Sequence, residues 1–100
     1  MKLEFHPEAE EELIESAAYY ELRVTGLGHQ LEAEMLRATS LLLSQPHLGK
    51  PVVGTLRQFA LNRFPFTLYY TIAENVLRIE AVAHQRRLPG YWRARIGSVN

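Results

Sequence analysis

The spacing of apolar residues changes once along this chain, from a helical repeat to a strand repeat. Over residues 8–44 the apolar side chains recur every three or four positions, as in an amphipathic helix. Over 56–83 they alternate with polar ones and are rich in aromatic and β-branched types, as in half-buried strands. Helices followed by strands predict an α+β domain in which a helical layer packs on one face of an antiparallel sheet.

The helical half divides into two helices at a turn around Gly26. Pro7 suits a first helical position because the N–H that it lacks would have no partner there, and four glutamates follow within the next five residues. We predict helices over 8–23 and 27–44, which so short a loop makes an antiparallel hairpin. Their predicted apolar stripes are Leu13, Ile14, Ala17, Ala18 and Tyr20, then Leu27, Leu31, Met35, Ala38, Leu41 and Leu42.

Strands are predicted on both sides of this hairpin. Residues 2–5 alternate polar and apolar, and the segments 56–61, 66–73 and 76–83 have no interior Pro or Gly. The last three predict a three-stranded antiparallel sheet, and 46–54, with two Pro and two Gly, predicts a loop. Neither flank of that loop could hold a core alone, so residues 1–100 are expected to form a single domain.

The pair Glu74-Asn75 has the length of a two-residue hairpin turn, and Asn tolerates positive φ. The turn predicts a register with Ile72 opposite Leu77, Tyr70 opposite Ile79, Leu68 opposite Ala81 and Phe66 opposite Ala83, all facing the core. The other face then holds Thr67, Tyr69, Thr71, Arg78, Glu80, Val82 and His84. We therefore expect His84 on a face that the core leaves open to a partner.

Acidic and basic residues occupy different halves of a chain whose net charge is zero. Residues 1–34 hold nine Glu against Lys2 and Arg23, and residues 35–100 hold Lys50 and eight Arg against Glu74 and Glu80. Two interpretations stay open: each half has a solvated face of one sign, or the basic half offers a surface to an acidic partner.

Several kinds of chemistry are not expected from this composition. There is no Cys and no Asp, and the four His show no ligand spacing, so no metal site and no cofactor are predicted. No phosphate-binding glycine loop and no nucleophile elbow occur. The N-terminus lacks a signal-peptide core, and no apolar run approaches the roughly 18 residues that span a membrane, so we expect a cytoplasmic protein.

The candidate functional residues gather toward the C-terminal end. They are Arg57, Arg63, Arg78, His84, Arg86, Arg87, Tyr91, Trp92, Arg93 and Arg95. Such residues bind phosphates, stack on bases, and can cleave RNA through its 2′-hydroxyl without a metal, although a solvated basic edge is the alternative. The carboxylates of 8–15 are interpreted as complement to the helix dipole, and Tyr19 and Tyr20 as helix surface and core edge.

Six segments, in this order, resemble the RelE/ParE superfamily of toxins from bacterial toxin–antitoxin operons. They are Phe5-His6-Pro7-Glu8-Ala9, Ala18-Tyr19-Tyr20-Glu21, Gly26-Leu27-Gly28, Pro46-His47-Leu48-Gly49, Arg63-Phe64-Pro65-Phe66 and 84–92 (His-Gln-Arg-Arg-Leu-Pro-Gly-Tyr-Trp). The resemblance implies a β-α-α-β-β-β fold with a short C-terminal helical tail. It also implies a role in plasmid stabilization and a cognate antitoxin with an acidic, amphipathic tail, bound in a toxin–antitoxin hetero-oligomer.

The superfamily has two activities, and its fold does not choose between them. The RelE branch cleaves ribosome-bound mRNA without a metal, and the ParE branch poisons DNA gyrase. In a nuclease the resemblance makes His84, Tyr91 and Arg63 catalytic. In either branch it implies target or antitoxin contacts at Arg57, Arg63, Tyr69, Arg78, His84, Arg86, Arg87, Tyr91, Trp92 and Arg93.

Two departures favour the ParE branch. Thr67 and Gln85 stand where nuclease members commonly carry cationic residues, which removes charge that would stabilise a transferring phosphoryl group. The long helix hairpin also resembles ParE more closely. We therefore expect a ParE-like gyrase inhibitor, with an mRNA interferase as the alternative and a degenerate toxin that only binds its antitoxin as a third possibility.

Overall fold

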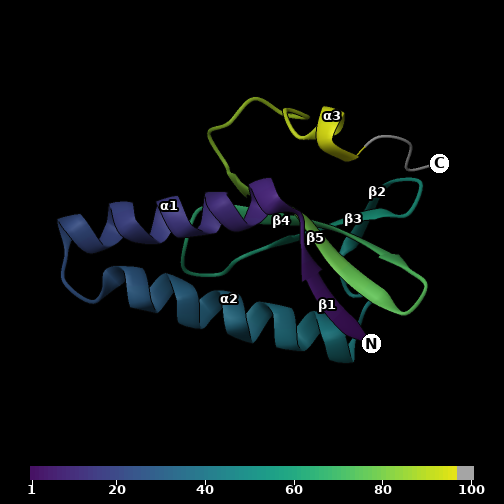
Figure 1. Ribbon diagram of the computed structural model, residues 1–100, viewed down its shortest axis with the longest axis horizontal. Coiled ribbons are helices and arrows are strands. Elements are labelled where there is room, and N and C mark those ends of the chain that lie inside the picture. Colours follow the sequence, from purple (N-terminus) through teal and green to yellow (C-terminus); the bar gives the residue numbers. More distant parts are fainter. Residues whose placement is uncertain (97–100) are drawn as a thin grey trace.

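Two long helices lie side by side along one face of a twisted sheet (Figure 1). This computed structural model describes residues 1–96; residues 97–100 of the predicted domain lie outside the described part. The elements are β1 (Lys2–Phe5), α1 (Pro7–Arg23), α2 (Leu27–Ser44), β2 (Lys50–Val53), β3 (Leu56–Ala60), β4 (Phe66–Ala73), β5 (Val76–His84) and α3 (Arg93–Ile96). The predicted α+β class, the helix hairpin and the short helical tail are confirmed.

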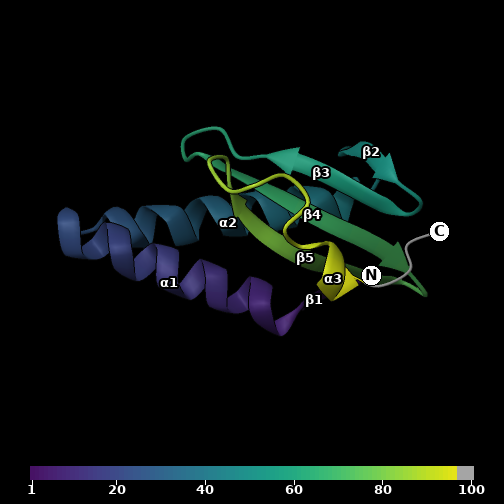
Figure 2. The ribbon, with the colours of Figure 1, turned by 90° about the horizontal axis from the view of Figure 1, so that it is seen from above.

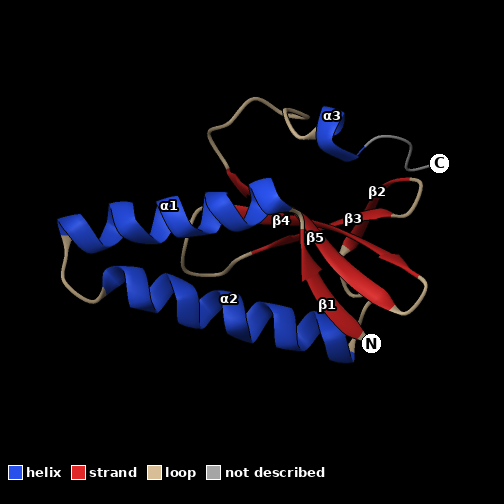
Figure 3. Cartoon of the chain, viewed as in Figure 1, coloured by secondary structure: helices blue, strands red, loops and turns tan. Residues whose placement is uncertain are grey.

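The sheet has five strands in the order β1-β5-β4-β3-β2, and it is mixed (Figure 3). The prediction of a three-stranded antiparallel sheet is wrong at both edges. β1 joins the sheet as a parallel neighbour of β5, with Phe5 beside Ile79. Parallel neighbours need a long connection, and here it comprises both helices and β2 to β4. β2 forms where a loop was predicted; it is exposed throughout, and Pro51 is tolerated because β2 is an edge strand.

The turn between β4 and β5 has the predicted two residues, with φ of 51° at Glu74 and 65° at Asn75. The predicted register holds near this turn, where Ile72 pairs with Leu77 and Tyr70 with Ile79. A β-bulge then shifts it by one residue at Glu80, so that Leu68 pairs with Val82 and Phe66 with His84, instead of with Ala81 and Ala83.

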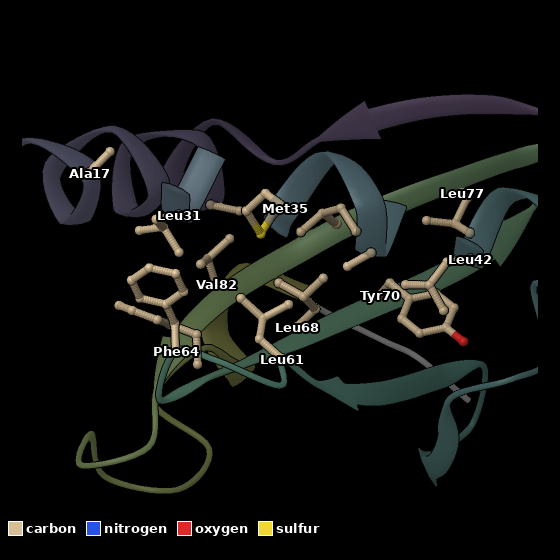
Figure 4. Packing of buried hydrophobic residues seen from close by; sticks show 14 residues of the cluster. Ala17, Leu31, Met35, Leu42, Leu61, Phe64, Leu68, Tyr70, Leu77 and Val82 are labelled. Atoms are coloured by element: carbon tan, nitrogen blue, oxygen red, sulfur yellow. The ribbon is translucent and has the colours of Figure 1, made fainter. Parts of the chain in front are cut away.

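This shift exchanges the faces of the last residues of β5. Val82, predicted on the open face, is buried in the core beneath the helices, and Figure 4 shows it among Leu31, Met35 and Leu68. His84 also lies on the helix side, with its ring 5.2 Å from that of Phe66. Its predicted place on the opposite face is therefore wrong, because the period of two holds only while no residue is inserted.

The main core fills the space between the helix hairpin and the sheet. Its fully buried side chains come from α2, β4 and β5 and include Leu31, Leu42, Leu68, Tyr70, Leu77 and Ile79. The predicted helical stripes are too wide, since Ile14, Ala18 and Leu41 are exposed. The two helices approach closely at Gly28, where a Cβ atom would collide with the carbonyl oxygen of Ala17.

The other face of the sheet is also covered, by residues 85–96, which we call the C-terminal segment. Leu56, Ala81 and Trp92 form a second buried cluster there, with Tyr69, Tyr91 and Ile96 packed against it. Figure 1 and Figure 2 both place α3 beside the first turns of α1. The face that the sequence predicted to be open is thus occupied at its centre by this chain.

Candidate functional site

The residues singled out by the sequence lie around a small hollow at the end of β5. The hollow measures about 160 Å³, and its lining includes Thr67, Tyr69, His84, Gln85, Arg87, Tyr91 and Trp92. The strands position Thr67, Tyr69 and His84. Turns position the rest: the N–H of Gln85 bonds to the Pro65 carbonyl, and the N–H of Arg87 bonds to the His84 carbonyl.

Glu12 of α1 fixes the C-terminal segment by accepting hydrogen bonds on both carboxylate oxygens. Oε2 accepts from the Tyr91 hydroxyl at 2.6 Å and from Nη2 of Arg95 at 3.1 Å. Oε1 accepts from the backbone N–H of Val82 at 2.9 Å and from Nη1 of Arg95 at 3.1 Å. One carboxylate therefore joins α1, the bulged part of β5 and the tail, at side chains that are mostly buried.

The Tyr91 phenol is consequently committed to a structural bond. Burial raises its pKa well above the usual range, and the hydrogen bond to Glu12 and the negative charge of that carboxylate raise it further. The Arg87 guanidinium stacks on the Tyr91 ring at 3.8 Å. A phenol whose proton is held by a carboxylate, and whose pKa is raised, is a poor general acid or base near neutral pH.

Trp92 is a packing residue. Only 4 % of it is exposed, and its ring lies 4.5 Å from that of Tyr69 in the second cluster. This burial explains why the C-terminal segment lies flat on the sheet, because a large aromatic side chain contributes about 2 kcal/mol or more when removed from water. The expectation that Trp92 makes partner contacts does not fit its burial.

His84 stays partly exposed at the end of β5. Its Nδ1 accepts a hydrogen bond from the Arg86 N–H at 3.0 Å, which leaves Nε2 to carry the proton of the neutral ring. The imidazole borders two hollows, the one described above and a second beside Tyr19 and Tyr20. Of the three nuclease candidates, His84 keeps an accessible ring, and Arg63 lies in another hollow together with Glu34 and Arg37.

The remaining arginines divide into bound and exposed groups. Arg57 is used internally, donating from Nη1 to the carbonyls of His47 and Gly49. Arg78 lies 3.8 Å from Glu80. Arg86, Arg87 and Arg93 are exposed along the C-terminal segment. We call these last three side chains the basic ridge.

Sequence reasoning missed the structural roles of two residues that organise the site, Glu12 and Arg95. Glu12 was interpreted as one of several helix-dipole acids, and Arg95 was left among the basic candidates. Arg95 also donates to the Glu80 carbonyl at 3.3 Å and lies 3.5 Å from Glu8. Nothing in the local sequence separates Glu12 from Glu11, because the distinction depends on partners that follow much later in the chain.

Within residues 1–96 there is no cluster of three or more His, Cys, Asp or Glu side chains that could hold a metal ion. None of the described helices is long and apolar enough to cross a membrane. The site is a basic, partly aromatic edge. The Tyr91 phenol in it is hydrogen-bonded to Glu12, and the Trp92 indole is packed in the second cluster.

Comparison with known proteins identifies the family. The model of the ParE toxin of type II toxin-antitoxin systems, parDE, matches residues 3–89. The chain belongs to the ParE toxin family. Solved structures agree with this fold: a chain from the chromosomal ParDE TA system of P. aeruginosa superposes with a TM-score of 0.73 at 17% identity, covering 84% of this chain and 95% of that one. No curated protein sequence matches significantly.

Membership of the ParE family confirms the resemblance read from the sequence. The matched range runs from Leu3, within β1, to Pro89, so it takes in His84, Arg86 and Arg87. It ends before Tyr91 and Arg95. The hydrogen bonds from Tyr91 and Arg95 to Glu12 thus involve residues beyond the part of the chain that the family model matches.

Proposed function

We propose that this chain is a ParE-type toxin that inhibits DNA gyrase and is neutralised by a cognate antitoxin. The match to the ParE family over residues 3–89 supports the toxin assignment. The proposed target would place the complex in the cytoplasm, and plasmid stabilization is the corresponding role. The toxin then acts by binding, so it needs no catalytic residues and no cofactor.

The observation that carries the choice against mRNA cleavage is the bond from Tyr91 to Glu12. Cleavage at a 2′-hydroxyl needs a base, an acid and cationic groups close to one phosphate. The Tyr91 hydroxyl donates to the Glu12 carboxylate at 2.6 Å, so its proton is not free to act in the reaction. Thr67 and Gln85 supply no cation, and Arg63 lines another hollow, beside α2. His84 and Arg87 remain on the lining of the hollow, with the Arg87 guanidinium stacked on the Tyr91 ring. They leave the reaction without the second acid or base that it needs.

The basic ridge supports the antitoxin half of the proposal. Arg86, Arg87 and Arg93 are exposed, and Leu88 between them is 80% exposed. An acidic amphipathic segment would bury that leucine and pair its carboxylates with the guanidinium groups. A hetero-oligomer of toxin and antitoxin follows from such a contact. We expect the gene beside this one to encode a small protein with an acidic, helix-forming tail.

The test is a gyrase assay run beside a ribosomal mRNA cleavage assay with the same purified toxin. We expect trapped, cleaved gyrase–DNA complexes and no cut mRNA, with His84→Ala leaving the mRNA result unchanged. Supercoiling that continues at saturating toxin would contradict the gyrase assignment. mRNA cleavage slowed at least about 100-fold by His84→Ala or Tyr91→Phe would instead establish the nuclease.

A further inference from the structure

A second hollow lies on the helix side of the sheet, separate from the basic ridge. It measures about 340 Å³ and is lined by Glu15, Ser16, Tyr19, Tyr20, Phe66 and His84. α1 supplies four of these side chains, and the paired ends of β4 and β5 supply Phe66 and His84. We call it the aromatic hollow. Nothing in the proposed contacts with an acidic antitoxin uses it, apart from the shared imidazole at its border.

Neighbouring aromatic rings of the hollow pack edge to face, so that their planes are nearly perpendicular. Tyr19 and Tyr20 lie 5.6 Å apart at 83°, Tyr20 and Phe66 lie 6.3 Å apart at 77°, and Phe66 and His84 lie 5.2 Å apart at 85°. Tyr19 is 51% exposed, although it is a large side chain that α1 could have turned toward the core. The arrangement leaves ring surface available to a ligand.

Charge decides which ligand fits. Glu15 places a carboxylate on the lining, and none of the six lining residues is a lysine or an arginine. This acid repels the phosphates of a nucleic acid strand and attracts a cation. The chain already displays the corresponding contact nearby, because the Arg23 guanidinium lies 3.8 Å from the centre of the Tyr19 ring. Aromatic faces beside a carboxylate suit a guanidinium, which stacks on rings and pairs with an acid.

We propose that the aromatic hollow binds an arginine side chain of a protein partner, with the guanidinium stacked on tyrosine and paired with Glu15. The identity of that partner, the toxin's target, rests on the proposed function, whereas the site itself does not. The antitoxin tail is expected to be acidic and to use the basic ridge. The two surfaces then have opposite charge and select different partners.

Binding can be measured without any partner by titrating the toxin with N-acetyl-arginine amide and following amide shifts by NMR. The uncharged citrulline analogue and adenosine monophosphate serve as comparison ligands. We expect saturable shifts confined to the residues of the hollow. Glu15→Gln and Tyr19→Leu should each weaken the affinity for the arginine ligand about 3-fold or more. Glu11→Gln is the matched control, because this acid is exposed one turn earlier and does not line the hollow.

Equal binding of the citrulline analogue, or shifts that Glu15→Gln and Tyr19→Leu leave unchanged, would overturn the proposal. Tighter binding of the adenosine phosphate would replace the arginine site with a nucleotide site. If the arginine ligand binds but gyrase is not inhibited, the hollow stands and the target assignment fails. If gyrase is inhibited equally by wild type and both variants, the hollow plays no part in target binding and its assignment to the target is wrong.

Discussion

Glu12 has a role that no other carboxylate of the described chain shares. It accepts from Val82, Tyr91 and Arg95, which belong to β5 and the C-terminal segment, while Glu11 beside it is exposed. A carboxylate in this position is favourable only because every oxygen is bonded and a guanidinium balances the charge. Removing the charge leaves Arg95 and the Val82 N–H with a weaker partner.

We therefore predict that Glu12→Gln lowers the free energy of unfolding by about 2 kcal/mol. The amide keeps the shape but loses the ion pair with Arg95 and turns one acceptor into a donor. Chemical denaturation followed by circular dichroism measures the change. Glu11→Gln, at an exposed site on the same helix, should stay within about 0.5 kcal/mol of wild type. Equal effects of the two substitutions would contradict the role given to Glu12.

The raised pKa of Tyr91 predicts how the stability of the fold changes with pH. The unfolded phenol has a pKa of about 10, and the folded pKa lies above it, so the folded chain holds the proton more tightly. The stability that the phenol contributes is complete below pH 10 and is lost as the pH rises from there toward the folded pKa. Denaturation series from pH 8 to pH 11 should show this loss, to which the raised pKa of Tyr70 also contributes.

In Tyr91→Phe the alkaline loss should be smaller, because the contribution of Tyr91 is removed while that of Tyr70 remains. The same substitution should lower stability at pH 7, since Glu12 loses the donor that lies at 2.6 Å. An alkaline profile identical to that of wild type would show that the proton of Tyr91 is not linked to folding.

At the scale of elements, the helix hairpin depends on a close approach and a shared cap. Gly28 lets α2 approach the Ala17 carbonyl of α1 without a side chain between them. Glu21 accepts the N–H groups of Gly26 and Gly28 at 2.7 and 3.0 Å, which satisfies donors at the start of α2. These hydrogen bonds lower the pKa of the Glu21 carboxyl. The residues that make the turn thus also set the spacing of the helices.

Gly28→Ala should therefore destabilise the chain by about 2 kcal/mol, although alanine is the better helix former. The added Cβ would collide with the Ala17 carbonyl oxygen, and backbone atoms on both helices would have to move. Thermal unfolding measures the loss. Gln30→Ala, at an exposed site of the same helix, is the control and should be neutral or slightly stabilising. A stabilised Gly28→Ala variant would contradict the close approach.

Elements also differ in how well the sequence predicted them. α1, α2 and the β4–β5 turn were predicted with nearly the bounds that they have, because amphipathic spacing and turn residues are local signals. β2 was missed because its residues are all exposed and include a proline. The bulge at Glu80 was missed because no residue type requires it. As a result, the sheet faces predicted for Val82 and His84 were wrong.

For the whole molecule, folding changes the meaning of the charge division. The sequence separates acidic and basic halves, but the fold brings some of each together: Arg95 pairs with Glu8 and Glu12, and Arg78 approaches Glu80. Arg57 bonds to backbone carbonyls. The surface left for an acidic partner is consequently narrower than the sequence indicated, and it centres on the basic ridge.

The position of the basic ridge predicts which arginine side chains contribute to antitoxin binding. The double substitution Arg86→Glu and Arg87→Glu should weaken binding of the cognate antitoxin at least about 10-fold at physiological salt, with a smaller effect as salt is raised. Isothermal titration calorimetry measures it. Lys2→Glu with Arg37→Glu makes the same change of charge at exposed sites away from the ridge and is the control. A loss as large in the control would mean that net charge, rather than the ridge, governs binding.

The sequence by itself determined the α+β class, the helix hairpin, the last two strands with their turn, and the family, since these rest on spacing and on segments read along the chain. The tertiary structure alone decided that β1 and β2 extend the sheet, that His84 faces the helices, and that Glu12 holds Tyr91 and Arg95. These outcomes depend on partners separated by up to most of the chain length, for which the sequence carries no local signal. They are also the features that turn a predicted open basic face into a covered face with a narrow basic ridge.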